Sequence, residues 1–119
     1  MKLSSGRHVM FLAVLLIASV LSTKVSAHPP KEVTLGWNPD GNLTVNVRHG
    51  VDDPEKHYIY RITVYVDNKV AATNDFKSQA GNDGLSVVIP IGPQPEGTNI
   101  TAEAFCVIMG SAVGSLVVP

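Results

Sequence analysis

From residue 33 onward, apolar and polar residues alternate along the chain in short segments. A period of two is typical of β-strands with one buried face, and no segment has the period of an amphipathic helix. Residues that favour turns separate the segments, most densely at 38–42 and 92–98. The pattern predicts seven strands, at 33–37, 43–48, 58–66, 70–75, 85–90, 99–107 and about 115–118.

Seven short strands without a helix predict an all-β domain, and the spacing of the turns favours an antiparallel β-sandwich of the immunoglobulin-like type. The longest predicted strand is 58–66. Its alternation predicts one face made of Tyr58, Tyr60, Ile62, Val64 and Val66.

The first 27 residues follow a different pattern. Lys2 and Arg7 precede an apolar run over 9–21, and a small-x-small sequence ends at Ala27. This arrangement predicts a helical signal peptide that is cleaved after Ala27. The run is shorter than the roughly 20 residues of a membrane span. We therefore expect a signal peptide at 1–27 and one domain at 28–119, in a periplasmic or secreted protein that has no membrane attachment after cleavage.

Cleavage changes the charge of the chain. It removes three basic residues and no acidic one, which leaves six basic and ten acidic residues and a net charge of −4. An acidic domain is a poor partner for nucleic acids and for anionic membrane surfaces. The domain has room for one core only, which excludes enzymes that need about two hundred residues. Cys106 is the only cysteine, so the chain forms no internal disulfide.

Residues that bind metals lie at the ends of the predicted strands. If successive strands alternate in direction, five of them share one end of the sandwich: His28, His49, His57, Cys106 and Met109. Imidazole and thiolate ligands suit iron, copper or zinc, whereas calcium prefers oxygen ligands. Solvated loop histidines and a cysteine that only packs in the core remain the alternatives at this point.

Two segments of the chain resemble a known family. The acidic loop that begins at His49 leads to H-Y-I at 57–59 and I-T-V-Y at 62–65. This resembles the loop, H-Y-I and W-I-E-V-Y strand in the iron-binding domain of the desulfoferrodoxin/neelaredoxin family, the superoxide reductases. The sequence F-C-V-I-M-G at 105–110 is similar to that family's Y-C-N-x-H-G.

The resemblance implies an immunoglobulin-like fold and a mononuclear, non-haem iron centre with four histidines and one axial cysteine. An open position on the iron would meet superoxide and reduce it to peroxide, in a superoxide reductase-like oxidoreductase. Carried over to this chain, His49 and His57 correspond to the two loop histidines and Cys106 to the axial cysteine. The implied partners are superoxide or an electron-donor protein, and self-association into a homo-oligomer stays open.

The chain departs from the family pattern at several positions. Seven residues separate the two loop histidines where the family has five, and Met109 stands in place of a family histidine. The family's upstream E-K-H motif has no counterpart, so His28 is the remaining imidazole before the loop. For the family lysine that attracts superoxide, the chain offers Lys56 and Lys31 as substitutes. Superoxide reduction therefore requires that the iron site be intact.

Two other functions remain open from the sequence. Two histidines, a cysteine and Met109 are the ligand types of blue-copper proteins, although those usually have a histidine between the cysteine and the methionine. After cleavage, the free amine and imidazole of His28 could also chelate copper, without the next backbone amide because Pro29 has no N–H. The other alternative is a metal-free immunoglobulin-like accessory or binding domain.

Overall fold

A computed structural model describes residues 28–119, so the predicted signal peptide at 1–27 lies outside the described residues. Within 28–119 all regular structure is β, and no helix there is long and apolar enough to cross a membrane. The strands are β1 Glu32–Trp37, β2 Asn42–Arg48, β3 Ile59–Val66, β4 Lys69–Asp75, β5 Gly84–Pro90, β6 Asn99–Cys106 and β7 Ser111–Val117.

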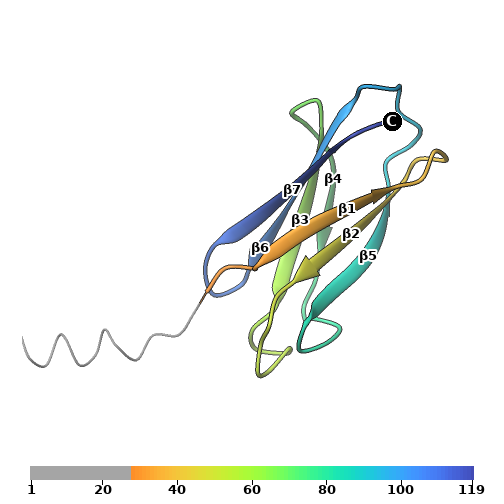
Figure 1. Ribbon diagram of the computed structural model, residues 1–119. Helices are drawn as coiled ribbons and strands as arrows, with labels where there is room; N and C mark the ends of the chain where they lie inside the picture. Colours follow the sequence, from red (N-terminus) through yellow and green to blue (C-terminus); the bar gives the residue numbers. More distant parts are fainter. Residues whose placement is uncertain (1–27) are drawn as a thin grey trace, which may run out of the picture.

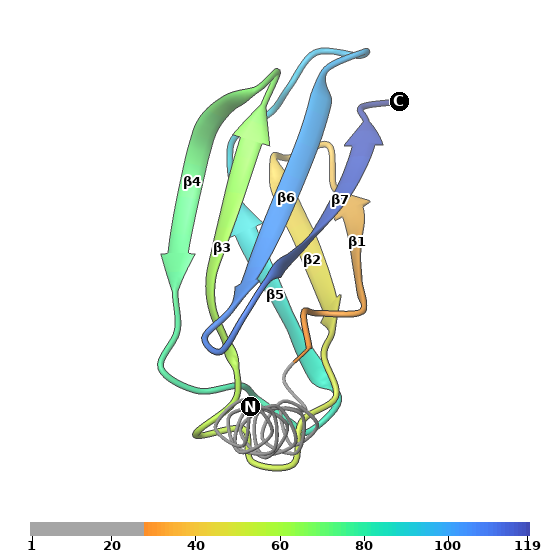
Figure 2. The same ribbon diagram turned by 90° about the vertical axis from the view of Figure 1, so that its left-hand side faces the viewer.

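The strands form two antiparallel sheets that pack face to face (Figures 1 and 2). One sheet has the order β1-β2-β5 and the other β4-β3-β6-β7. β1 also lies beside β7, where a Cβ at Gly114 would collide with the backbone of Val33. The predicted all-β sandwich of seven antiparallel strands is therefore confirmed.

The core consists of the inward-facing side chains of both sheets. On β2 and β6 every second residue is buried, and the small Ala102 and Ala104 of β6 fill the space between larger neighbours. Full burial of a Leu, Ile or Val side chain contributes about 1.5–3 kcal/mol each. Among the fully buried members are Leu43, Val45, Ile62 and Ile100.

The predicted face of β3 is wrong at the start of the strand. Ile59, and not Tyr58 or Tyr60, is fully buried there. In the pairing with β6, Ile59 opposes Cys106 while Arg61 opposes Phe105, so Tyr60 is an extra residue in a β-bulge. A bulge shifts the alternation by one residue. From Ile62 to Val64 the predicted inward side chains are then correct.

The predicted start of the last strand is also wrong, because β7 begins at Ser111 and not near Ser115. The chain reverses directly after β6, where the N–H of Cys106 donates to the carbonyl of Gly110 (3.0 Å) and Gly110 has a φ of 77°. Val113, which is 56% exposed, lies on the outer face of β7. Apolar residues on both faces hide the alternation that would have predicted this strand.

We expect Ile62→Ala to lower the free energy of unfolding by about 2–5 kcal/mol, because it leaves a cavity in a closed core. Equilibrium urea denaturation measures the change. The matched control is Val113→Thr on the outer face, for which we expect a change within about 0.5 kcal/mol. Equal losses in the two variants would contradict this assignment of the core.

Candidate metal centre

Three potential metal ligands from separate parts of the chain meet at one end of the sandwich. His49 follows β2, His57 precedes β3 and Cys106 is the last residue of β6. One ligand atom from each lies within 4.8 Å of the others. Figure 2 shows the end of β2, the start of β3 and the end of β6 together at the lower end of the molecule. The structure thus brings these three residues together at one end, as strand counting predicts.

Gln79 fixes the tautomer of His49. The amide Nε2 of Gln79 donates to the carbonyls of His49 and Gly81, both at 2.9 Å, so its Oε1 must be the acceptor. Oε1 accepts the N–H of Ile59 (3.2 Å) and faces Nδ1 of His49 at 2.8 Å. Nδ1 of His49 therefore carries the proton, and its Nε2 presents a free lone pair.

Nε2 of His49 and Nε2 of His57 are both buried and have no hydrogen-bond partner. The His49 side chain is fully buried, and the two ring centroids are 4.7 Å apart with the planes nearly perpendicular. A buried polar atom without a partner costs about 1–3 kcal/mol. Two such atoms beside a thiol fit a bound metal ion, which would accept both lone pairs.

The sulfur of Cys106 is the third ligand atom of this cluster, which consists of His49, His57 and Cys106. The residue is 4% exposed, and Sγ accepts the backbone N–H of Ile108 at 3.4 Å. An N–H donor at sulfur stabilises the thiolate form that binds metals. The turn that places this donor is the one closed by Gly110.

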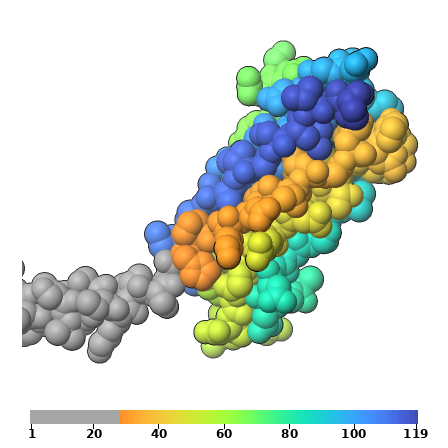
Figure 3. Space-filling view, viewed as in Figure 1, coloured from red at the N-terminus to blue at the C-terminus, as the bar shows by residue number. Residues whose placement is uncertain are grey.

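His28 places a third imidazole beside these residues, outside the group of three whose ligand atoms lie within 4.8 Å of one another. Its ring centroid lies 5.8 Å from that of His49 and 5.5 Å from that of His57. The two residues that follow His28 pack against the domain. Pro29 lies so close to Gly110 that a Cβ added to Gly110 would be 2.7 Å from the Cβ of Pro29, and Pro30 is buried. In Figure 3 the start of the described chain, in orange, lies against the β6–β7 turn, in blue.

Burial lowers the pKa of His57 below its ordinary value of 6.5, and the neighbouring His49 and His28 lower it further. Asp52 acts in the opposite direction with a smaller effect. The neutral imidazole is the form that binds a metal, so the surroundings of His57 favour the ligand state.

This shift predicts a pH dependence for the metal-free protein. The folded state binds a proton at His57 less readily than the unfolded state does, so stability falls as the pH drops below about 6.5 and levels off below the folded pKa. We expect a lower melting temperature at pH 5.5 than at pH 7.5 in the presence of a chelator. His57→Gln should reduce this difference; an unchanged difference would contradict the assignment to His57.

The other predicted site residues lie around the cluster. Met109 is in the β6–β7 turn and is 48% exposed. Lys56 is exposed in the turn before His57, whose N–H donates to the carbonyl of Asp53 (2.9 Å). Lys31 lines a hollow together with Arg48 and His49. Lys31, and not the predicted Lys56, therefore lines a hollow together with His49.

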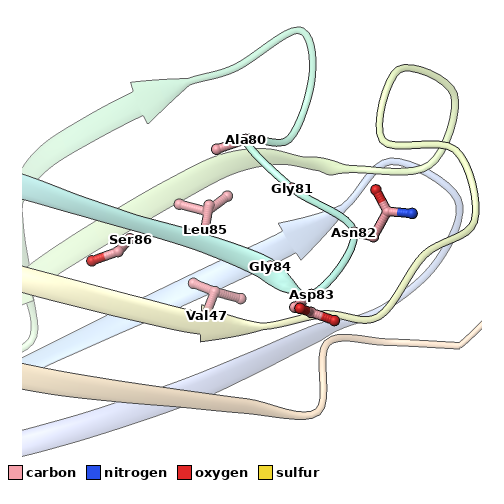
Figure 4. A pocket seen from close by; sticks show the side chains of 8 residues that line it. All are labelled: Val47, Ala80, Gly81, Asn82, Asp83, Gly84, Leu85 and Ser86. Carbon is pink, nitrogen blue, oxygen red and sulfur yellow. The ribbon is translucent and has the colours of Figure 1, made fainter.

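Hollows lead to the cluster from outside. The lining of one of about 520 Å³ includes His28, His57, Asp52, Asn82 and Asp83. A small solute can therefore approach the histidines. A separate hollow of about 440 Å³ lies between the 80–84 loop and the adjoining ends of β2 and β5, where Figure 4 shows Val47 and Leu85. Its lining contains no member of the cluster.

Sequence reasoning missed Gln79, which orients His49. A single glutamine in a predicted loop belongs to no motif, and its role depends on the position of His49, thirty residues away. Only the fold brings the two together.

No protein-family model matches the chain, and no curated protein matches it in sequence. Among solved structures it is similar to a superoxide reductase (neelaredoxin) from Ignicoccus hospitalis, with 16% identity and a TM-score of 0.46 over 77% of this chain and 81% of that one. A single-substitution variant of that protein is similar as well, with 15% identity and a TM-score of 0.48 over 81% of this chain and 82% of that one. The similar structures carry the name of the family that the sequence resembles.

Proposed function

We propose that the protein binds one iron ion through His49, His57 and Cys106 and uses it to reduce superoxide. The observation that carries this proposal is the pair of buried Nε2 atoms without partners beside a buried thiol. The resemblance of 57–59 and 105–110 to the superoxide reductase pattern supports iron over other metals.

The spacing of the ligands fits a single ion. Bonds of 2.0–2.3 Å would hold the ligand atoms of one ion about 3–4 Å apart. The ligand atoms lie within 4.8 Å, so closure around the ion requires shifts of about 1 Å. Imidazoles on one such ion have ring centroids about 5 Å apart. The separation between His49 and His57 is 4.7 Å.

Iron, when bound, supplies the one-electron couple for the reaction. Reduction of superoxide to hydrogen peroxide takes one electron and two protons; an electron-donor protein restores the electron, and solvent supplies the protons. The chain's own residues hold the ligands: Gln79 keeps Nε2 of His49 unprotonated, and the N–H of Ile108 supports the thiolate. The hollow beside His49 is lined by Lys31, Arg48 and Asp83, and Arg48 pairs with Glu32 at 3.3 Å. Lys31 is therefore the cation there that would favour the approach of a small anion.

This reaction suits an exported protein, because the predicted signal peptide would deliver the domain to the periplasm or the exterior. Superoxide carries a charge and does not cross membranes readily. A centre that faces an oxidising compartment would therefore act on superoxide formed there.

The test is metal analysis of protein purified anaerobically from its own compartment, followed by measurement of superoxide consumption with the reduced protein. We expect about one iron per chain, a thiolate-to-iron charge-transfer band after oxidation, and one peroxide formed per superoxide consumed. An intense blue band with copper would replace this function with copper electron transfer. Protein that takes up neither metal would be an immunoglobulin-like accessory domain.

Met109→His should tighten iron binding by about tenfold or more and raise superoxide reduction, because an imidazole binds iron more strongly than a thioether. The variant restores the histidine that the family pattern has at this position. Competition with a chelator measures the affinity. Val117→His, on the outer face at the far end of β7, is the matched control and should change neither property. Equal effects of the two variants would contradict the proposal that a side chain at position 109 can reach the ion.

A further inference from the structure

The first described residue, His28, would become the N-terminus of the chain if the predicted signal peptide is removed, and its imidazole lies beside the candidate metal centre. We propose that cleavage after Ala27 completes this centre, because the new α-amino group of His28 becomes a metal ligand together with its imidazole. This inference rests on the proposed metal centre, and it adds that the precursor binds the metal more weakly than the processed chain.

The position of His28 follows from anchors that do not involve its own side chain. Pro29 packs on Gly110, Pro30 is buried, and the N–H of Lys31 donates to the carbonyl of Arg48 at 2.8 Å. The two prolines have fixed φ angles, which limits the movement of the residue before them. His28 is thereby held with its ring 5.5 Å from His57 and 5.8 Å from His49.

Cleavage changes the chemistry of one nitrogen. Hydrolysis of the Ala27–His28 bond consumes one water, leaves Ala27 with a carboxylate and leaves His28 with a free α-amino group. In the precursor this nitrogen is an amide, whose delocalised lone pair does not bind a metal unless the N–H proton is lost. An α-amino group has an ordinary pKa of about 7.7–8.0, so a metal ion displaces its proton readily near neutral pH.

The amine and the imidazole of His28 form one chelating unit. The α-nitrogen and Nδ1 close a six-membered ring around a metal ion. Nδ1 now lies 3.2 Å from the carbonyl oxygen of Pro29, and the exposed ring can exchange this contact for the metal. Pro29 has no N–H, so the next backbone nitrogen cannot join the chelate. His28 therefore adds two ligands at most, to the three from His49, His57 and Cys106.

The experiment compares three purified proteins: residues 28–119 with a free amine on His28, residues 27–119 with the same imidazole but an amide at that nitrogen, and His28→Ala in the 28–119 chain. The members of the hydrophobic core lie between Val33 and Val118, so each form contains the whole core. Co²⁺ is the probe, because its thiolate charge-transfer band reports binding at Cys106. Competition with a chelator gives the affinity, and thermal unfolding without metal checks that the three proteins are equally folded.

We expect 28–119 to bind Co²⁺ at least about tenfold more tightly than 27–119, and also more tightly than His28→Ala, which keeps a free amine but lacks the imidazole of the chelate. Equal affinity of 28–119 and 27–119, with the thiolate band present in both, would overturn the role of the amine and leave the proposed function standing. If none of the proteins binds Co²⁺ or Fe²⁺, both the metal centre and this inference fail. The full-length precursor should behave like 27–119.

Discussion

Cys106→Ser is expected to weaken metal binding by about 100-fold or more and to abolish the thiolate charge-transfer band. The serine hydroxyl is not ionised near neutral pH, so it cannot supply the negative charge and electron donation of a thiolate. Serine is close to cysteine in size, and the N–H of Ile108 can donate to its oxygen. Folding of the metal-free protein should therefore change little, by about 1 kcal/mol. Chelator competition, absorption spectra and urea denaturation measure the three effects.

The reverse result would identify Cys106 as a core residue. In that case metal content would stay the same in Cys106→Ser, and the variant would change only the stability of the fold. Cys106→Ala separates the two cases further, since it removes the ligand without burying a new polar group. If Cys106 is a metal ligand, both variants lose the metal. If Cys106 is only a core residue, both variants keep it.

Gln79→Ala is expected to lower the free energy of unfolding by about 2–4 kcal/mol and metal affinity by about 10- to 100-fold. The variant leaves the N–H of Ile59, Nδ1 of His49 and two backbone carbonyls without their partner. His49 can then change tautomer and place a proton on Nε2, where the metal would bind. Urea denaturation and chelator competition measure the two losses.

One further variant tests which atoms of Gln79 matter, and a variant at Gln94 serves as the control. Gln79→Glu keeps an oxygen that accepts from His49 and Ile59 but loses the donor to the carbonyls, so metal affinity should fall less than stability. Gln94→Ala is the matched control at the other end of the sandwich, where the amide makes two long contacts of 3.4 Å. If Gln94→Ala and Gln79→Ala cost the same, Gln79 has no special role.

The fold could be predicted from the sequence where each strand has one polar and one apolar face. β2 and β6 alternate strictly, and both were predicted to within a residue or two of their bounds. Prediction failed at Tyr60, because a bulge arises from the pairing with β6 and leaves no local signal. It failed at the start of β7 because apolar side chains also occupy the outer face there.

Part of the candidate site could also be predicted from the pattern of strands. Alternating strand directions place the ends of β2 and β6 and the start of β3 at one end of the molecule, which suffices to group His49, His57 and Cys106. Distances, burial and the partner of each nitrogen depend on loops, which have no periodic pattern. The role of Gln79 follows from such a loop contact, so only the structure reveals it.

The placement of His49 and Cys106 has a consequence for the mechanical integrity of the sandwich. They lie at the ends of the second and sixth strands, one in each sheet. In antibody domains a disulfide joins the two sheets through these same two strands. This chain has a single cysteine, so an ion held by His49 and Cys106 would take the place of that covalent brace. Binding that is specific to the folded state contributes about 4 kcal/mol when free metal exceeds Kd a thousandfold. The lifetime of the folded domain would then follow the local supply of metal.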